Sequence, residues 1–281
     1  MIRTALVGFG LAGEHLHAPY LHAPDYQLVA VQSSRPEAVA AYDATLPVYP
    51  TLEALLEAEQ IDLVVIATAN DLHYPLARLA LLSGCDVLVE KPFTVTLEEA
   101  ETLTELARTH GRLLTVYHNR RYTKDFRTLM TLLKSGRLGT LQTFEAHYDR
   151  YRPDVQERWR EQDVPGAGLL YDLGSHLIDQ ALIAFDEIPD RVFCDQTIQR
   201  QDGIVDEVDT KRTTYQLAEA NGPLQDFPFV SGHFGDYYTD LAPAIRKRTT
   251  PPVSAKQAEL VMKIIDRAQK SAKVGTWIEV D

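Results

Sequence analysis

The first 118 residues show a regular alternation of short apolar runs and longer amphipathic segments. The apolar runs are five to nine residues long and rich in β-branched side chains, as expected of buried parallel strands. They occupy residues 4–8, 26–34, 62–68, 86–92 and 113–118. The segments between them, at 11–23, 51–60, 73–84 and 96–111, have helical character. This alternation predicts a doubly wound α/β domain of the Rossmann type, with helices on both faces of a parallel sheet.

A glycine-rich segment follows the first predicted strand directly. Gly8, Gly10 and Gly13 have the spacing Gly-x-Gly-x-x-Gly, and a predicted helix follows them. In this context one glycine allows a sharp turn, one lets the backbone approach a pyrophosphate, and one lets the helix pack closely on the strand. The motif is common by chance, so a turn that happens to be rich in glycine is the alternative. The order of strand, glycines and helix favours a dinucleotide site, with backbone N–H groups facing an anion.

Polar or small residues follow each of the five predicted strands. Ligands of such sheets bind at the carboxyl ends of the strands, so we expect these residues to share one rim. The first strand ends in the glycines. The other four end in Ser33, Ser34 and Arg35; Thr68, Asn70 and Asp71; Glu90 and Lys91; and His118, Asn119 and Arg120. For any single strand end, a solvated loop explains the polarity equally well.

The end of the second predicted strand indicates which dinucleotide would bind. An Asp or Glu about 20 residues after the glycines usually binds the adenosine ribose of NAD, and no carboxylate ends this strand. Ser33, Ser34 and Arg35 stand there instead. Hydroxyl groups and a guanidinium suit a 2′-phosphate, which favours NADP, with NAD as the alternative. The alternatives are that Arg35 is a solvated loop residue and that Glu37 turns in to supply a carboxylate.

The pattern changes after residue 118, which predicts a second domain over 119–281 following a dinucleotide-binding domain over 1–118. A helix is expected over 120–139, stopping at Ser135 and Gly136, and a strand over 140–151. A C-terminal helix is expected over 254–275, docked through Leu260, Ile264, Ile265 and Ala268.

Composition limits the classes of function. The 281 residues are 45% hydrophobic and 24% charged, which is typical of a globular protein of about two domains. No run is long enough to span a membrane, and no secretory leader is apparent, so we expect a cytoplasmic protein. The net charge of −12 argues against nucleic-acid and membrane partners. Two cysteines and no zinc-ligand spacing predict neither a disulfide framework nor a metal site.

Two positions carry candidate proton-transfer groups. Lys91 follows a buried strand, and Pro92 keeps it extended, so its side chain should reach over the rim of the sheet. Asp172, His176 and Asp179 share one stripe of a predicted helix. An imidazole with a carboxylate one turn away suits reversible proton transfer near neutral pH. The alternatives are a surface lysine, a capping aspartate and a hydrogen-bonded core histidine.

The segments VGFGLAG, TANDLH, VEKP and DLGSHLID, in this order, resemble the Gfo/Idh/MocA family of NAD(P)-dependent sugar and cyclitol oxidoreductases, most closely its scyllo-inositol dehydrogenase-like subgroup. Ala69 stands where proline is usual. The resemblance implies hydride transfer between the nicotinamide and a hydroxyl-bearing carbon of a polyol, cyclitol or sugar. It implies proton transfer by Lys91 and His176 and substrate binding by Asp172. It also implies cofactor contacts from Asn70, His73, Glu90, Trp159 and Arg160.

The resemblance also shows a departure from the family pattern. In relatives, a motif like Asp206–Asp209 leads into several alternating strands, whereas here the chain continues at once into a region resembling one far downstream. We therefore expect a shortened α+β second domain that lacks several strands near 209–211. In relatives that sheet often forms an oligomer interface, so a homo-oligomer remains an open expectation.

Three functions fit these features to different degrees. The first is the NADP-dependent dehydrogenase described above. The second is a dinucleotide-binding regulatory or sensor protein whose catalysis is weakened by the shortened domain. An unrelated Rossmann protein such as a methyltransferase gives no role to Lys91 or His176.

Overall fold

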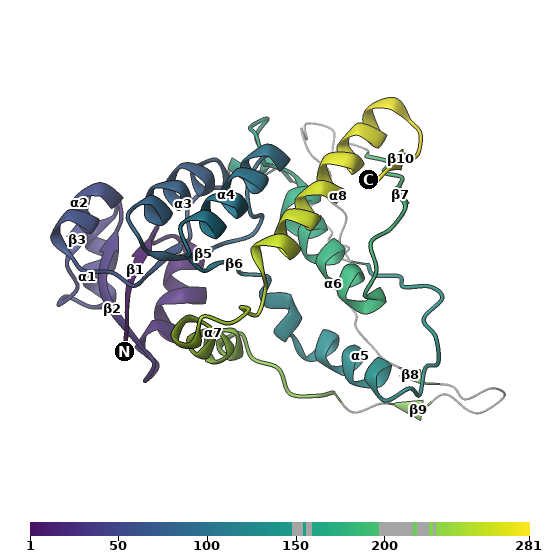
Figure 1. Cartoon of the computed structure of the whole chain (residues 1–281), viewed down its shortest axis with the longest axis horizontal. Coiled ribbons are helices and arrows are strands. Elements are labelled where there is room, and N and C mark those ends of the chain that lie inside the picture. The colour runs from purple at the N-terminus through teal and green to yellow at the C-terminus, as the bar shows by residue number, and fades with distance from the viewer. Residues whose placement is uncertain (148–153, 156–158, 197–215, 218–224, 227–228) are drawn as a thin grey trace.

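A computed structural model shows a six-stranded parallel sheet in the order β3-β2-β1-β4-β5-β6 (Figure 1). It describes residues 1–147, 154–155, 159–196, 216–217, 225–226 and 229–281, without the side chains of 160, 216–217 and 225–226. The order is that of a Rossmann fold, and it confirms the predicted doubly wound sheet. The strands are β1 (Ile2–Val7), β2 (Tyr26–Gln32), β3 (Val48–Tyr49), β4 (Leu63–Ile66), β5 (Asp86–Val89) and β6 (Leu114–Val116).

Helices connect and cover these strands. They are α1 (Pro36–Tyr42), α2 (Leu52–Ala58), α3 (His73–Leu82) and α4 (Leu97–Thr109), and two short turns, η1 (Gly13–His17) and η2 (Ala18–His22), follow β1. Four of the expected helical segments are confirmed, whereas α1 and the short strand β3 were not expected. Pro36 begins α1, where a missing N–H costs no hydrogen bond.

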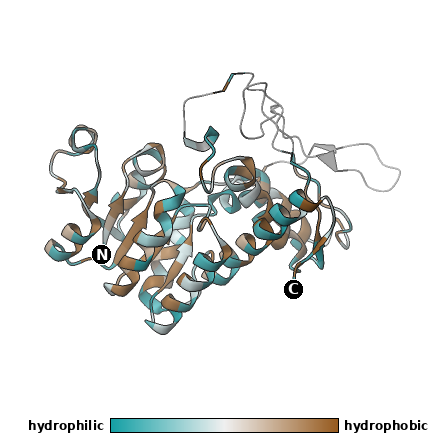
Figure 2. Ribbon diagram, turned by 90° about the horizontal axis from the view of Figure 1, so that it is seen from above, coloured by the Kyte–Doolittle hydropathy of each residue, from teal (hydrophilic) through white to brown (hydrophobic). Residues whose placement is uncertain are grey.

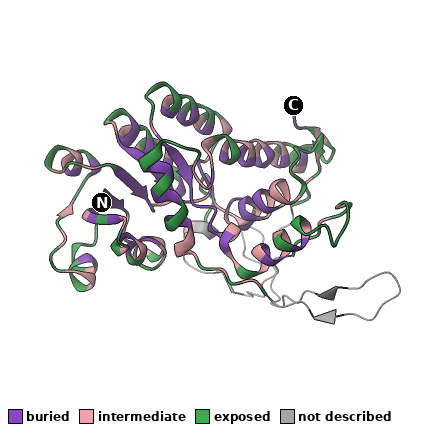
Figure 3. Ribbon diagram, turned by 60° about the horizontal axis from the view of Figure 1, so that its bottom comes forward, coloured by how far each residue is buried: buried purple, intermediate pink, exposed green. Residues whose placement is uncertain are grey.

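The centre of the sheet is the most buried part of the molecule. Every residue of β4 is fully buried, and the strands are predominantly apolar, as Figures 2 and 3 show. Burying one such aliphatic side chain contributes about 1.5–3 kcal/mol to folding. Strands covered on both faces therefore read as continuous apolar runs, which explains why the sequence located them.

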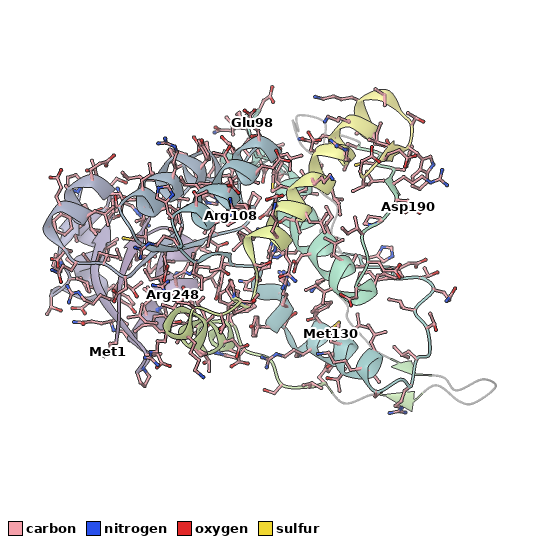
Figure 4. The ribbon with its side chains drawn as sticks, in the orientation of Figure 1. Met1, Glu98, Arg108, Met130, Asp190 and Arg248 are labelled. Carbon is pink, nitrogen blue, oxygen red and sulfur yellow. The ribbon has the colours of Figure 1, made fainter. Side chains whose placement is uncertain are left out.

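The described part of the second half is mainly helical. Its helices are α5 (Lys124–Lys134), α6 (Ser175–Phe185), α7 (Gly235–Lys247) and α8 (Ala255–Val274). It also contains the short helical turns η4 (Asn119–Tyr122), η5 (Trp159–Glu161) and η6 (Leu170–Gly174), whereas η3 (Asn70–Leu72) belongs to the first half. Two small antiparallel pairs complete it: β7 (Arg191–Val192) with β10 (Ile278–Glu279), and β8 (Gln216–Leu217) with β9 (Gln225–Asp226). Met1 and Asp190 lie toward opposite ends of the molecule (Figure 4).

The strand predicted over 140–151 is wrong for residues 140–147, which form no regular structure. Residues 148–151 lie outside the described part of the chain. A strand persists only when neighbouring strands satisfy its backbone N–H and C=O groups. In the described part of the chain, no ladder includes residues 140–147, so alternation in the sequence does not produce a strand here.

Residues near the C-terminus complete the core of the first sheet. Tyr237 and Tyr238 of α7 are buried, and the Tyr237 hydroxyl donates to the carbonyl of Val116 at 2.8 Å. Thr115 donates to the carbonyl of Val253 at 2.6 Å, just before α8 begins. The helix α8 then packs against α4 and α6. Docking of the C-terminal helix is confirmed, and the domain boundary at 118–119 stays a prediction.

Of the helices that the structure describes, none combines the length and apolar character needed to cross a bilayer.

Candidate active site

The glycine loop between β1 and η1 is shaped by three different constraints. Gly8 has φ +92°, and a Cβ there would lie 2.5 Å from the carbonyl oxygen of Ala67. A Cβ on Gly13 would overlap the carbonyl oxygen of Gly8. A Cβ on Gly10 would meet no described atom within 4 Å. Gly8 and Gly13 therefore hold the turn together, whereas Gly10 leaves open the space that a pyrophosphate requires.

The end of β2 lies beside this loop. The guanidinium of Arg35 donates to the carbonyl oxygen of Phe9, between Gly8 and Gly10. The hydroxyl oxygen of Ser33 accepts a hydrogen bond from the backbone N–H of Arg35 at 3.0 Å, and Ser34 is exposed. The structure thus brings Arg35 into contact with the glycine loop, and Ser33 and Ser34 precede it in the chain. Arg35 is exposed, so its charge is available to an anion there.

Three other predicted cofactor contacts are engaged within the protein. The Asn70 side chain donates to the carbonyl of Gly166 at 2.8 Å. His73 is fully buried, and its Nδ1 is 2.8 Å from the carbonyl oxygen of Pro92. Glu90 is buried and its carboxylate lies 3.0 Å from Nε2 of His17. Their observed contacts join loops and strand ends, and their predicted contact with a cofactor stays a prediction.

Trp159 begins the short turn η5 (Trp159–Glu161) and is half-buried. The side chain of Arg160 lies outside the described residues, as do most of the residues of the loop at 148–158. The expected contacts of Trp159 and Arg160 with a cofactor stay predictions.

Lys91 and Asp172 form an ion pair between the two halves of the chain. Nζ of Lys91 lies 2.6 Å from Oδ1 of Asp172 and also donates to its backbone carbonyl at 2.7 Å. Lys91 follows β5 and precedes a cis peptide bond to Pro92. Asp172 lies in the π-helical turn η6 that leads into α6. Both side chains are mostly but not completely buried, at 13% and 23% exposure, so a small molecule could reach them.

The two carboxylates of the predicted helical stripe, Asp172 and Asp179, bind different cations. Asp172 meets Lys91, whereas Asp179 accepts two hydrogen bonds from the guanidinium of Arg121, at 2.6 and 2.8 Å. Asp179 is only 2% exposed and its charge is balanced, so it is a structural group. His176 lies between them along the helix, one turn from each.

His176 is held in its neutral form by its surroundings. Burial lowers its pKa well below 6.5, and the positive charge of Lys91 and the neighbouring His118 and Arg120 lower it further. Its Nδ1 is buried and has no hydrogen-bond partner among the described residues. A neutral imidazole beside a lysine can accept a proton from a hydroxyl group at neutral pH.

We expect the substitution Lys91→Met to raise the pKa of His176. It removes a positive charge that disfavours the imidazolium, and this change favours the charged ring. Burial remains, so the pKa should stay below 6.5. NMR titration of the His176 ring measures it, with the exposed Lys134→Met on α5 as the control. An unchanged pKa in Lys91→Met would show that the two groups do not interact.

Several residues near this site were missed or given no role by the sequence. His17 links Glu90 to the hydroxyl of Tyr238, whose oxygen lies 2.6 Å from Nδ1 of His17. Arg121 holds Asp179. His118 was expected at the rim only as a polar strand end, and its ring centroid lies 6.1 Å from that of His176. The feature of the sequence that could have identified His118 as a site residue is its position just after a buried strand.

A hollow of about 1130 Å³ lies on the other side of the segment that carries Asp172, and neither Lys91 nor His176 lines it. Its apolar lining comes from Leu170, Leu173 and Leu177 with Met262 and Ile265 of α8. Among the described residues, no group of three or more His, Cys, Asp or Glu could hold a metal ion.

Family models match both halves of the chain. Residues 2–118 match the model of an oxidoreductase family with an NAD-binding Rossmann fold, named GFO_IDH_MocA. Residues 126–221 match a GFO/IDH/MocA C-terminal domain. The two matches together cover more than two thirds of the chain.

The chain covers different fractions of its relatives' lengths. It is 48% identical to the uncharacterized oxidoreductase YdgJ of Escherichia coli, over 66% of the chain and 54% of YdgJ. The chain thus spans about half the length of that relative. It is 31% identical to scyllo-inositol 2-dehydrogenase (NADP(+)) IolW of Bacillus subtilis, over 97% of the chain and 94% of IolW. That alignment runs over 339 residues against 281 in this chain, so IolW carries a segment that this chain lacks.

The fold is also similar to that of solved structures. The yvaA protein of Bacillus subtilis superposes with a TM-score of 0.93 and 30% sequence identity, over 100% of this chain and 98% of that chain.

Proposed function

The chain belongs to the Gfo/Idh/MocA family of oxidoreductases and carries its NAD(P)-binding Rossmann domain, and on this basis we propose that it is an NADP-dependent dehydrogenase. Its substrate would be a polyol, cyclitol or sugar, oxidised at a carbon that bears a hydroxyl group. The named relative supports this class, because IolW is a scyllo-inositol 2-dehydrogenase.

One observation carries the proposal. Lys91 lies at the carboxyl end of β5, in the sheet whose first turn is the open glycine loop, and its ion pair with Asp172 brings η6 and the neutral His176 of α6 to this edge. Rossmann sheets bind their ligands at this edge. The chain therefore offers proton-transfer groups and a dinucleotide cradle on one rim.

The chain's own residues would divide the work as follows. Gly8 and Gly13 hold the turn and Gly10 leaves room for the pyrophosphate. When bound, the dinucleotide exchanges a hydride with the substrate through its nicotinamide ring. Asp172 orients Lys91, and the ammonium would bind and polarise the reacting oxygen. His176, kept neutral by burial, would take the hydroxyl proton during oxidation and return it during reduction.

The cofactor preference rests on the end of β2. Arg35 is exposed beside the glycine loop, and Ser33 and Ser34 add hydroxyl groups where NAD-specific sheets usually have a carboxylate. An anionic 2′-phosphate would gain a charged partner there, whereas a ribose 2′-hydroxyl would gain little. The relative IolW is named for NADP(+), which agrees with this preference.

We expect Arg35→Asp to weaken NADP binding much more than NAD binding. The substitution replaces a partner of the 2′-phosphate by a like charge, and loss of one charge-assisted contact alone costs about 1.5–3 kcal/mol, or roughly ten- to a hundredfold in affinity. Fluorescence titration of NADPH and NADH measures both constants. Lys134→Asp, at an exposed position on α5, makes the same change of net charge and is the matched control. Equal weakening of both cofactors by Arg35→Asp would contradict the NADP assignment.

Turnover tests the enzymatic function. Purified protein should reduce NADP⁺ with at least one member of a panel of inositols, aldoses and other polyols. Absence of turnover with every substrate, together with NADPH binding, would instead support a second function as a dinucleotide-binding regulatory protein. The specific observation that favours this second function is the segment present in IolW and missing here.

A further inference from the structure

His118 occupies a buried position at the end of β6, on the rim that carries Lys91. The backbone turns sharply at His118, where φ is −73° and ψ is 63°. The backbone N–H of Asn119 donates to the carbonyl of Tyr117 at 2.7 Å and closes this turn. These angles are those of an inverse γ-turn. The residue is 1% exposed. The turn fixes the direction of the side chain at the point where β6 ends.

The two ring nitrogens of His118 are buried and have no hydrogen-bond partner among the described residues. Two other buried histidines have hydrogen-bond partners on at least one ring nitrogen. His17 contacts Tyr238 and Glu90 through its two nitrogens, and His73 contacts the carbonyl of Pro92. A neutral imidazole has one donor and one acceptor, and leaving both unpaired in the interior is unfavourable. Such an orphaned pair calls for a partner that the chain itself does not supply.

The surroundings of His118 identify the direction of that partner. Its ring lies edge-to-face beside that of His176, with centroids 6.1 Å apart and planes inclined by 77°. No hydrogen bond joins the two rings, so the unpaired nitrogens of His118 lie beside the proton-transfer group of the candidate site. The nearby carboxylate of Asp179 is occupied by Arg121. Lys91 and Glu90 also lie close enough to influence the charge of His118, and burial lowers its pKa.

We propose that His118 binds a second hydroxyl group of the substrate, on the carbon next to the one that His176 and Lys91 serve. This inference rests on the proposed dehydrogenase function. Oxygens on adjacent carbons of a diol are separated by roughly the length of a hydrogen bond, so two neighbouring imidazoles can each bind one of them. His118 is then a specificity-determining residue that selects vicinal diols over isolated alcohols.

The unpaired nitrogens argue against a structural role for His118. A structural histidine has protein partners whose loss destabilises the fold, whereas the nitrogens of His118 have none among the described residues. Replacing an unpaired polar group by an apolar ring of similar shape is neutral or stabilising. The substitution His118→Phe should therefore leave thermal stability unchanged or raise it.

The test compares two substrates and three proteins. The substrates are scyllo-inositol, or the polyol of highest turnover, and its deoxy analogue lacking the hydroxyl next to the oxidised carbon. The proteins are wild type, His118→Phe and the control His110→Phe, which alters an exposed histidine after α4. We expect wild type and the control to prefer the diol by about a hundredfold in kcat/KM, because a site built for a hydroxyl rejects the analogue that lacks it. His118→Phe should lose this preference, mainly because KM for the diol rises. His118→Asn, which keeps a hydrogen-bonding side chain, should retain part of the preference.

The outcomes separate this inference from the proposed function. If wild type oxidises the diol and His118→Phe keeps the same preference over the deoxy analogue, the role of His118 is overturned and the dehydrogenase function stands. A marked loss of thermal stability in His118→Phe, with the preference kept, would indicate a structural histidine and also overturn it. If wild type oxidises no substrate of the panel, the dehydrogenase function fails and the inference fails with it.

Discussion

The substitution His176→Asn is expected to lower kcat/KM for alcohol oxidation by about 10²- to 10⁴-fold, the usual contribution of a positioned general base. Asparagine keeps a polar side chain of similar reach but cannot accept the proton at any accessible pH. His176 is 5% exposed and its Nδ1 has no partner among the described residues, so little structural bonding is lost. The loss should therefore appear in turnover and not in folding.

Two measurements make this expectation specific. NADPH affinity should remain that of wild type, because the glycine loop and Arg35 are untouched. His15→Asn is the control, since His15 is an exposed histidine on η1. Turnover of His176→Asn close to that of wild type would remove His176 from the proton-transfer step.

The substitution Gly13→Ala is expected to destabilise the protein and to abolish cofactor binding together. The added methyl group would overlap the carbonyl oxygen of Gly8, which is backbone and cannot rotate away. Overpacking of this kind costs about 1–3 kcal/mol and shifts the backbone. The displaced atoms are those of the turn itself, so the binding loop loses its shape. Denaturant unfolding and NADPH titration measure the two effects.

Gly10→Ala is the matched variant for this loop. A Cβ on Gly10 meets no described atom within 4 Å, so the free energy of unfolding should change by no more than about 0.5 kcal/mol. NADPH affinity should nevertheless fall by about tenfold or more, because the methyl group occupies space that the pyrophosphate needs. Wild-type affinity in Gly10→Ala would mean that the pyrophosphate does not approach this residue.

The sequence located the sheet more reliably than the second half. Strands such as Leu63–Ile66 are covered on both faces and leave a continuous apolar run that is readable locally. The capped helix α8 was equally clear, with Ser254 and Gln257 forming a capping box at its start. Residues 140–147 alternate as a strand does but form none, because a strand depends on neighbours elsewhere in the chain.

For the candidate site, the sequence identified the residue types and the structure assigned their partners. Lys91, Asp172 and His176 were expected to act together, and the ion pair at 2.6 Å shows that the first two meet. Asp179 was expected on the same stripe, but Arg121 binds it, and nothing in the spacing along the chain indicated this pairing. The role of His118 became visible only once its unpaired nitrogens and its distance from His176 were known.

By itself, the sequence determined the alternation of strands and helices, the glycine turn and the absence of a carboxylate at the end of the second strand, because each is encoded in a few adjacent residues. Only the tertiary structure decided which charges meet. Lys91 and Asp172 are 81 residues apart, and Arg121 and Asp179 are 58 apart. Electrostatic attraction acts between atoms close in space, and burial sets its strength, so neither can be read from spacing along the chain.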